Sequence, residues 1–271
     1  MSAPALKPPF SYYGGKTTLA PQIAKLLPAH DHYVEPFAGS LAVLLAKPRS
    51  SRETVNDLDK NLMTFWKVLR EKPEELERLA RLTPHSRKEF EISENLDSKS
   101  DIEKARRVWV RLTQGRTNSL RDNPGWRNEK AARVGISRPM YLKKYANRFE
   151  GVADRLAGVT LENMDAIEMI EQYGEEPSVC IYADPPYLGS VRSWGYGIEM
   201  LEDGLHVKLA RALNKVKATV VLSGYASPLY EELYEGWYRH EFKAPPNLAK
   251  TETQNEILWS NVPLGNQASL F

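Results

Sequence analysis

At 271 residues, with 42% hydrophobic and 27% charged side chains, the chain has the composition of a globular protein that can bury a substantial core. Its longest apolar run, Leu41 to Ala46, is far too short to span a bilayer, and Met1 to Pro4 shows no basic and apolar signal segment, so we expect no membrane association. The single cysteine, Cys180, excludes an internal disulfide and a thiolate-rich metal site and fits a cytoplasmic protein, and the histidines lack metal-ligand spacing, so no metal is expected.

The charged residues are unevenly distributed along the chain. Of its 37 lysines and arginines, 13 lie between Lys104 and Arg148, where the only acids are Asp122 and Glu129. The remaining chain is therefore net acidic, although the total charge is +2. A solvated helix face would interleave acids with bases. A basic block in an otherwise acidic protein is instead typical of a surface that binds a polyanion.

A proline-containing arm, expected to be loosely held, precedes a glycine-rich segment and an amphipathic helix. Gly15, Lys16 and Thr17 resemble the end of a phosphate-binding loop, but Phe10 stands where that motif needs its first glycine. The motif also needs a preceding hydrophobic strand, and the arm is rich in proline. A glycine pair beside a lysine at a helix entrance still suits a carboxylate, because helix N-termini favour anions.

Two strands with acids near their ends are predicted next. His32 to Phe37 forms the first strand and contains Glu35, and a helix begins at Gly39, where a ligand can approach the backbone closely. The second strand runs from Thr54 to Asp57. Its final acid lies about twenty residues beyond Gly39, the spacing at which nucleotide-binding βαβ units place an acid on ribose hydroxyls.

The helix after this strand has an apolar stripe, and either of two acids can cap it. Asp59 is better placed than Asp57 for the cap, which leaves Asp57 available to a ligand. The stripe consists of Leu62, Phe65, Trp66 and Leu69. Further helices follow, the last spanning Met140 to Leu156. Before it, residues Gln114 to Pro139 are polar and lack apolar periodicity, and a segment of this kind is functional or disordered.

Alternation of strands and helices resumes at residue 159. Val159 to Glu162 is predicted as a strand, and Asp165 opens the next helix. Ser178 to Ala183 reads as a buried strand that stops at Asp184, because the two prolines that follow lack N–H groups and cannot extend a ladder. Asp184 then lies at the carboxyl end of a strand, where open α/β sheets bind ligands. A proline turn with Asp184 as a helix cap is the alternative.

The last part of the chain completes an α/β pattern. Residues Gly189 to Gly197 form a loop, and both a lid over a substrate and an ordinary surface loop remain open. Ala218 to Ser223 is predicted as a strand. Trp237 to Lys243 and Glu256 to Asn261 are predicted as a terminal hairpin.

The strand tip at Asp184 suits chemistry on the amino group of a nucleobase. Such an amine is a poor nucleophile, because its lone pair is delocalised into the ring. The Asp184 carboxylate and the Pro185 carbonyl can accept hydrogen bonds from its N–H groups and free that lone pair. Tyr187 can stack on a base that has been pulled out of the helix.

With these residues in place, the chain resembles the Dam-like (D12 class, alpha group) N6-adenine DNA methyltransferases. The matching motifs follow the family's order: Tyr12 to Lys16, Val34 to Gly39, Asn56-Asp57, Asn163 to Asp165, Asp184 to Tyr187, and Glu256 to Trp259. One departure is Leu41, where many members carry a second small residue.

The resemblance implies a Rossmann-like S-adenosylmethionine-dependent methyltransferase sheet with a reversed C-terminal hairpin. Residues 1–70 and 159–271 would form this catalytic domain, and residues 71–158 an inserted, mostly helical DNA target-recognition domain. By similarity, the cofactor S-adenosylmethionine would be bound by Tyr12, Gly15, Lys16, Glu35, Phe37, Gly39, Asp57, Asp165 and Asp184. Lys16 would lie near the methionine carboxylate, Asp57 at the ribose and Asp165 at the cofactor's adenine amine.

The same resemblance implies methylation of the N6 amine of an adenine flipped out of double-stranded DNA. The catalytic residues would be Asp184, Pro185, Pro186 and Tyr187. The basic segment offers residue types suited to phosphate and base-edge contacts, namely Arg116, Asn118, Arg121, Arg127 and Arg133. A cognate restriction nuclease is left open as a partner. The alternatives are methylation of cytosine N4 or of RNA adenine, and an inactive DNA-binding homologue.

Overall fold

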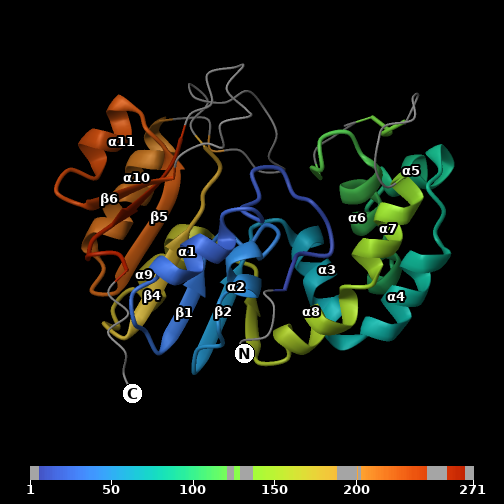
Figure 1. Cartoon of the computed structure of the whole chain (residues 1–271), viewed down its shortest axis with the longest axis horizontal. Coiled ribbons are helices and arrows are strands. Elements are labelled where there is room, and N and C mark those ends of the chain that lie inside the picture. Colours follow the sequence, from blue (N-terminus) through green and yellow to red (C-terminus); the bar gives the residue numbers. More distant parts are fainter. Residues whose placement is uncertain are drawn as a thin grey trace.

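A computed structural model describes residues 6–120, 125–128, 137–187, 200, 203–242 and 255–265. These residues form a seven-stranded sheet with the order β3-β2-β1-β4-β5-β7-β6, covered by helices (Figure 1). The strands are β1 His32–Glu35, β2 Arg52–Asn56, β3 Val159–Glu162, β4 Val179–Ala183, β5 Thr219–Tyr225, β6 Tyr238–Phe242 and β7 Glu256–Ser260. Neighbours among β1 to β5 pair in parallel, whereas β7 runs antiparallel to both β5 and β6. The predicted α/β sheet with a reversed terminal hairpin is therefore confirmed.

The strand order reverses between β1 and β4, which are adjacent in the sheet although β2 and β3 lie between them in the sequence. The chain that leaves β1 turns toward β2, and the chain that leaves β4 turns toward β5. In open α/β sheets the loops at such a switch point diverge and leave a crevice for a ligand. The segments after Glu35 and Ala183 both border this crevice.

Successive strand residues face opposite sides of the sheet, as the pleat requires. Tyr33, Cys180 and Tyr182 belong to one buried cluster, together with residues of α1 Ala20–Leu26, α2 Ala42–Ala46 and α3 Lys60–Glu71. Val34 and Ile181 belong to a second cluster, together with residues of α9 Ala166–Tyr173, α10 Asp203–Lys215 and α11 Pro228–Leu233. Both faces of the sheet are thus covered, and β1 and β4 are buried along their whole length.

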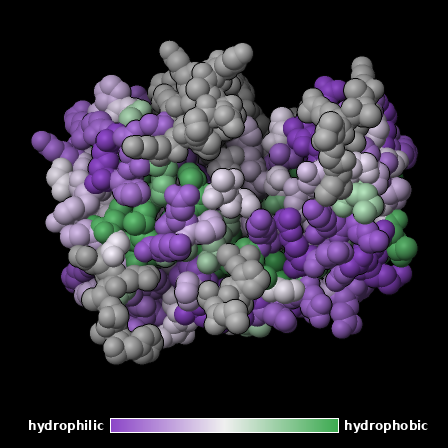
Figure 2. All heavy atoms as spheres, viewed as in Figure 1, coloured by the Kyte–Doolittle hydropathy of each residue, from purple (hydrophilic) through white to green (hydrophobic). Residues whose placement is uncertain are grey.

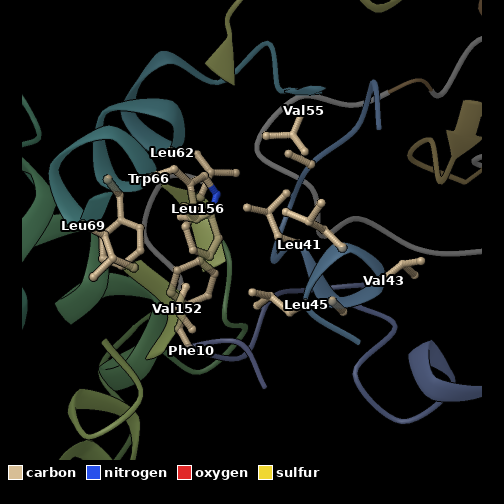
Figure 3. Packing of buried hydrophobic residues seen from close by; sticks show 14 of the residues in the cluster. Phe10, Leu41, Val43, Leu45, Val55, Leu62, Trp66, Leu69, Val152 and Leu156 are labelled. Atoms are coloured by element: carbon tan, nitrogen blue, oxygen red, sulfur yellow. The ribbon is translucent and has the colours of Figure 1, made fainter. Parts of the chain in front are cut away.

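The helices described between α3 and β3 form the group on the right of Figure 1: α4 Pro73–Leu82, α5 Arg87–Ser93, α6 Asp101–Gln114, α7 Arg138–Ala146 and α8 Phe149–Leu156. Asp59 caps α3, accepting hydrogen bonds from the backbone of Asn61 and Leu62. The predicted stripe on α3 is wholly buried, and α3 packs against α6 and α8. Figure 3 shows Leu62, Trp66 and Leu69 beside Val152 and Leu156 of α8.

The described part of the N-terminal arm, from residue 6 onward, is packed, so the expectation of a loosely held arm was wrong for these residues. Phe10 is 1% exposed, and the centre of its ring lies 5.1 Å from that of Phe65; Figure 3 shows Phe10 among the packed side chains. The indole N–H of Trp109 donates to the Pro9 carbonyl at 3.1 Å, and the Arg148 guanidinium donates to the Pro8 carbonyl at 2.5 Å. These partners lie 100 and 140 residues away in the chain, so local sequence carried no sign of them.

Some predicted element boundaries were also wrong. The helix predicted over 140–156 is two helices, because the chain leaves regular helical structure between Ala146 and Phe149. The first strand ends at Glu35 rather than Phe37, and α2 begins at Ala42 rather than Gly39. The residues between β1 and α2 form the turn that borders the crevice.

A buried ionic cluster joins β2 to α8. Glu53 of β2 is 3% exposed and accepts hydrogen bonds from Lys47 at 2.7 Å and from both terminal nitrogens of Arg155 in α8. Burial by itself would raise the pKa of Glu53, but the bonds from Arg155 and Lys47 outweigh it and lower that pKa to about 2. Burial and the nearby Arg155 charge lower the pKa of Lys47, although its bond to Glu53 opposes this.

Candidate active site

A cavity of about 230 Å³ lies at the carboxyl ends of β1, β2 and β4. All nine residues predicted to bind the cofactor line it: Tyr12, Gly15, Lys16, Glu35, Phe37, Gly39, Asp57, Asp165 and Asp184. They come from five separate segments of the chain. The structure therefore brings the predicted set together around one cavity.

In the turn after β1, Gly39 and Leu41 both have a left-handed backbone conformation, and Ser40 lies between them. Gly39 has φ +45°, and a Cβ atom there would lie 3.3 Å from the Tyr12 ring, so the position favours glycine. Leu41 has φ 55° and ψ 30°, a conformation that is costly for a side chain of this type. Its side chain is fully buried (Figure 3). Leu41 thus adopts the left-handed backbone conformation that glycine adopts more easily, and its buried side chain packs beneath the turn.

Asp57 faces this turn from the end of β2. Its two carboxylate oxygens accept backbone hydrogen bonds from Gly39 and Asp59, each at 3.0 Å. Burial raises the pKa of Asp57 to about 6, although these two bonds act to lower it. The backbone bonds fix the carboxylate at the cavity wall, while Asp59 supplies the helix cap, as the sequence predicted.

Asp165 and Glu35 complete the acidic part of the wall. Asp165 is exposed and caps α9, its Oδ1 accepting from the backbone of Ile167 at 2.8 Å and Glu168 at 3.3 Å. Glu35 is 3% exposed and accepts a hydrogen bond from the Tyr33 hydroxyl at 2.8 Å. Burial raises the pKa of Glu35 to about 8, and the nearby Asp184 charge adds to this. Glu35 is therefore mostly protonated at neutral pH.

Lys16 and Asp184 form a buried ion pair at the tip of β4. The Lys16 Nζ lies 2.6 Å from Oδ1 and 2.8 Å from Oδ2 of Asp184, and it also donates to the Gly14 carbonyl at 3.1 Å. Burial raises the pKa of Asp184 to about 6, while the Lys16 charge opposes that rise. Burial would lower the pKa of Lys16, but the charges of Asp184 and Glu256 outweigh it and raise that pKa. Both groups are charged at neutral pH.

The remaining residues of the tip are placed differently. Pro186 lines the cavity. Tyr187 is 3% exposed, and the centre of its ring lies 4.5 Å from that of Tyr225. Its hydroxyl donates to Glu256 at 2.6 Å. Stacking of a base on Tyr187 stays a prediction. The alternative of Asp184 as a helix cap was wrong, because Pro185 to Tyr187, which follow it, are not helical. The loop Gly189 to Gly197 lies outside the described residues.

Part of the polar segment after α6 folds back on itself. Gly115 pairs with Trp126 as a β-bridge, and the Arg116 side chain donates to the Trp126 carbonyl. The Arg127 guanidinium donates to the Arg116 carbonyl and to Asn118 Oδ1. Asn118 has φ 52°, and its carbonyl accepts from the backbone of Tyr13 at 3.0 Å. The candidate DNA-binding segment therefore touches the loop that carries Lys16. Arg121 and Arg133 lie outside the described residues.

The surface around this segment is strongly polar. Figure 2 shows hydrophilic residues over most of the helical group on the right, where α4 to α7 lie in Figure 1. Among the described residues, no group of His, Cys, Asp and Glu side chains has the arrangement of a metal site. No described helix combines the length and apolar character that a bilayer crossing needs.

Several cavity residues were missed by sequence reasoning. Leu58, Ile167, Tyr182, Met200, Leu205 and Leu209 all line the cavity. Leu58 is 49% exposed directly beside Asp57, and the exposure of a large apolar side chain next to a site acid is visible only in the structure. Tyr182 precedes Asp184 by two residues, so its place on the same strand end could have been inferred from the alternation of β4.

The chain is similar to proteins whose descriptions name a methyltransferase or a methylase. A family model described as D12 class N6 adenine-specific DNA methyltransferase matches residues 12–248. The chain is 26% identical over 288 residues to the type II methyltransferase M1.LlaDCHI of Lactococcus lactis subsp. cremoris, covering 93% of each. It is 26% identical over 249 residues to the retron Ec67 DNA adenine methylase of Escherichia coli, covering 85% of this chain and 81% of that relative. A solved structure, the putative methyltransferase yhhF from Escherichia coli, aligns with a TM-score of 0.35 and 12% identity over 90% of this chain and 80% of that one.

The family match spans the glycine-rich loop, the acids of the cavity wall and the Asp184 tip. Because it covers most of the sequence, this chain belongs to the D12 class N6 adenine-specific DNA methyltransferase family.

Proposed function

We propose that the protein transfers a methyl group from S-adenosylmethionine to the N6 amine of an adenine flipped out of double-stranded DNA. The observation that carries the proposal is one cavity that is lined by both Asp57 and the Lys16-bound Asp184. Residues 1–70 and 159–271 would carry the chemistry, and residues 71–158 would read the DNA.

The chemistry of the cavity wall fits this cofactor. The two fixed oxygens of Asp57 suit the hydroxyls of a ribose. Leu58 and Ile167, which also line the cavity, offer apolar contacts to the face of a purine, and Asp165 offers a carboxylate to its amine. When bound, S-adenosylmethionine supplies an electrophilic methyl group on a sulfonium sulfur, which leaves as a neutral thioether.

The residues at the β4 tip would orient and polarise the adenine amine. The Asp184 carboxylate, ionised at neutral pH, accepts a hydrogen bond from an N6 hydrogen, and the Pro185 carbonyl accepts the other. Both bonds shift electron density onto the nitrogen and direct its lone pair. When the amine gains the methyl group it loses one proton, and the Asp184 carboxylate can accept that proton. Because the leaving group is good, orientation and polarisation supply most of the catalysis.

The test is methylation of DNA by the purified protein with isotopically labelled S-adenosylmethionine, followed by identification of the modified base. Labelled N6-methyladenine supports the proposal. N4-methylcytosine, or label in RNA alone, would replace it with one of the alternative substrates. Cofactor binding without product on any DNA would indicate an inactive homologue. The type II name of one relative makes a cognate restriction nuclease worth testing as a partner.

Cofactor affinity is expected to fall in acid because of Asp57. Its pKa is about 6 in the free protein. A ribose hydroxyl donates to the ionised carboxylate, so protonation below this pH removes an acceptor and raises the dissociation constant. Because one proton is linked to binding, the dissociation constant rises by at most about tenfold for each pH unit below this pKa. Calorimetric titrations with S-adenosylmethionine between about pH 5 and about pH 7.5 measure it.

Asp57→Asn should bind the cofactor more weakly at neutral pH and lose most of this pH dependence. Asp203→Asn, at the exposed start of α10, is the matched control and should behave as the unmodified protein. If the fall in cofactor affinity at low pH persists unchanged in Asp57→Asn, the group that titrates is Asp184 or another group of the cavity.

DNA affinity is expected to depend on the basic segment. Arg116 is exposed, so Arg116→Ala removes charge with little loss of packing. Combined replacement of Arg116, Arg121, Arg127 and Arg133 by alanine should weaken DNA binding. It should also reduce the slope of affinity against salt by roughly one for each phosphate that is no longer neutralised. Fluorescence anisotropy over a salt series measures both quantities.

Lys208→Ala, on the exposed side of α10, is the control for this loss of charge and should leave DNA affinity as it was. Unchanged DNA affinity in the combined arginine variant would move the interface elsewhere.

A further inference from the structure

Glu256, the first residue of β7, reaches into the Asp184 tip from the reversed strand. Its Oε1 accepts hydrogen bonds from the Tyr187 hydroxyl and from the Ser223 hydroxyl, each at 2.6 Å. The Lys16 Nζ lies 3.6 Å from the same oxygen, and the Glu256 side chain is 10% exposed. One carboxylate oxygen thus has two hydrogen-bond donors, from the β4 tip and β5, and an ion-pair partner on the glycine-rich loop.

Tyr187 has two carboxylates within reach of one proton. Its hydroxyl lies 2.6 Å from Glu256 Oε1 and 3.3 Å from Asp184 Oδ1. A phenol donates a single hydrogen, and the shorter O–H···O⁻ distance is that of a strong charge-assisted bond. The proton therefore points to Glu256, and it does not occupy Asp184 Oδ1.

We propose that Glu256 is a positioning residue, which withdraws the Tyr187 hydroxyl proton from Asp184. Asp184 Oδ1, which already accepts from Lys16 at 2.6 Å, then keeps its second lone pair for a hydrogen bond from the substrate amine. This inference rests on the proposed function and deepens it. Without the Glu256 charge, the Tyr187 hydroxyl turns to Asp184, and the substrate amine must compete for the same oxygen.

The three partners of Glu256 act together in this role. Ser223, fully buried on β5, holds the carboxylate in place. Lys16 bridges Glu256 and Asp184, so it keeps two carboxylates close to each other that would otherwise repel. The Lys16 ammonium also lies 4.8 Å from the centre of the Tyr187 ring, which restrains that ring between the two acids.

Glu256→Gln is the direct test, because it keeps the shape and removes the charge. The turnover number kcat on a saturating DNA should fall by roughly 10- to 100-fold, as for the loss of a hydrogen bond to a charged group. The dissociation constant for S-adenosylmethionine should stay within about twofold, because the substitution leaves the proposed ribose and purine contacts in place. Glu241→Gln, an exposed position on the neighbouring strand β6, is the matched control and should keep normal kcat.

Removal of the Tyr187 hydroxyl separates this role from a structural one. In Glu256→Gln the Tyr187→Phe substitution deletes the competing proton, so the double variant should be faster than Glu256→Gln alone. A double variant that is equally slow or slower, or a Glu256→Gln enzyme with normal kcat, overturns the proposal.

A crystal structure of Glu256→Gln gives a result that does not depend on activity. The Tyr187 hydroxyl should move closer to Asp184 Oδ1 than the 3.3 Å of the unmodified protein. An unchanged or longer distance overturns the positioning role even in a protein that methylates no DNA. Failure of the proposed function shows instead as a lack of product in the unmodified protein.

Discussion

Asp184→Asn is expected to lower the rate of adenine methylation by about 10²- to 10³-fold, the loss that follows removal of one preorganised polar group from an active site. The amide keeps the shape of the carboxylate but carries no charge and offers one acceptor oxygen. Its NH₂ group then faces either Lys16 or the substrate amine, and both are donors. Single-turnover methylation with labelled cofactor measures the rate, and DNA binding should survive.

Asp184→Ala should lose activity at least as completely and should also lose stability. It leaves the Lys16 ammonium, which is 5% exposed, with Glu256 at 3.6 Å as its remaining carboxylate partner among the described residues. Removal of one member of a buried pair typically costs about 3–5 kcal/mol. Comparison of the two variants thus separates the chemical role from the structural one. Near-normal turnover in Asp184→Asn would refute the role given to this carboxylate.

Glu53→Ala is expected to reduce the free energy of unfolding by about 3–5 kcal/mol, because it leaves two buried cations without their shared anion. Lys47 and Arg155 are 6% and 5% exposed. Arg155 also donates to the Leu44 carbonyl, but this bond does not neutralise its charge. Urea denaturation measures the change. Glu71→Ala, which removes a carboxylate from a half-exposed pair with Arg70, should cost about 1 kcal/mol or less.

Two further measurements check the cause of this loss. Replacement of Glu53 by leucine together with Arg155 by methionine should cost less than Glu53→Ala, because no unpaired Arg155 charge is left in the core. The pKa of Glu53 is depressed to about 2 from an ordinary value of 4.5. Its stabilisation is therefore fully present above about pH 4.5 and is lost as the pH falls toward 2. If Glu53→Ala loses as much stability as the unmodified protein when the pH falls toward 2, this assignment is contradicted.

Features that depend on residues close together in the chain were predicted well. The end of β4 at Ala183 followed from prolines that cannot extend a strand, whereas β2 ends at Asn56, one residue before the predicted Asp57. The α3 stripe and its Asp59 cap followed from helical periodicity and capping chemistry. The set of cavity residues, which are distant in the chain, followed from the resemblance to a known family, whose motifs occur here in the same order. The packed N-terminal arm was not predicted, because its partners lie far away in the chain.

The sequence by itself determined which acids stand at strand ends and which segment is basic, since side-chain type and spacing decide both. Only the tertiary structure decided which side chains pair with each other. Lys16 bonds Asp184 across 168 residues, and Glu256 accepts from Tyr187 across 69. The Arg155 bond to Glu53 spans 102 residues. Such contacts depend on how distant elements pack, and the burial that results sets the strength of each charge interaction, so no local pattern encodes them.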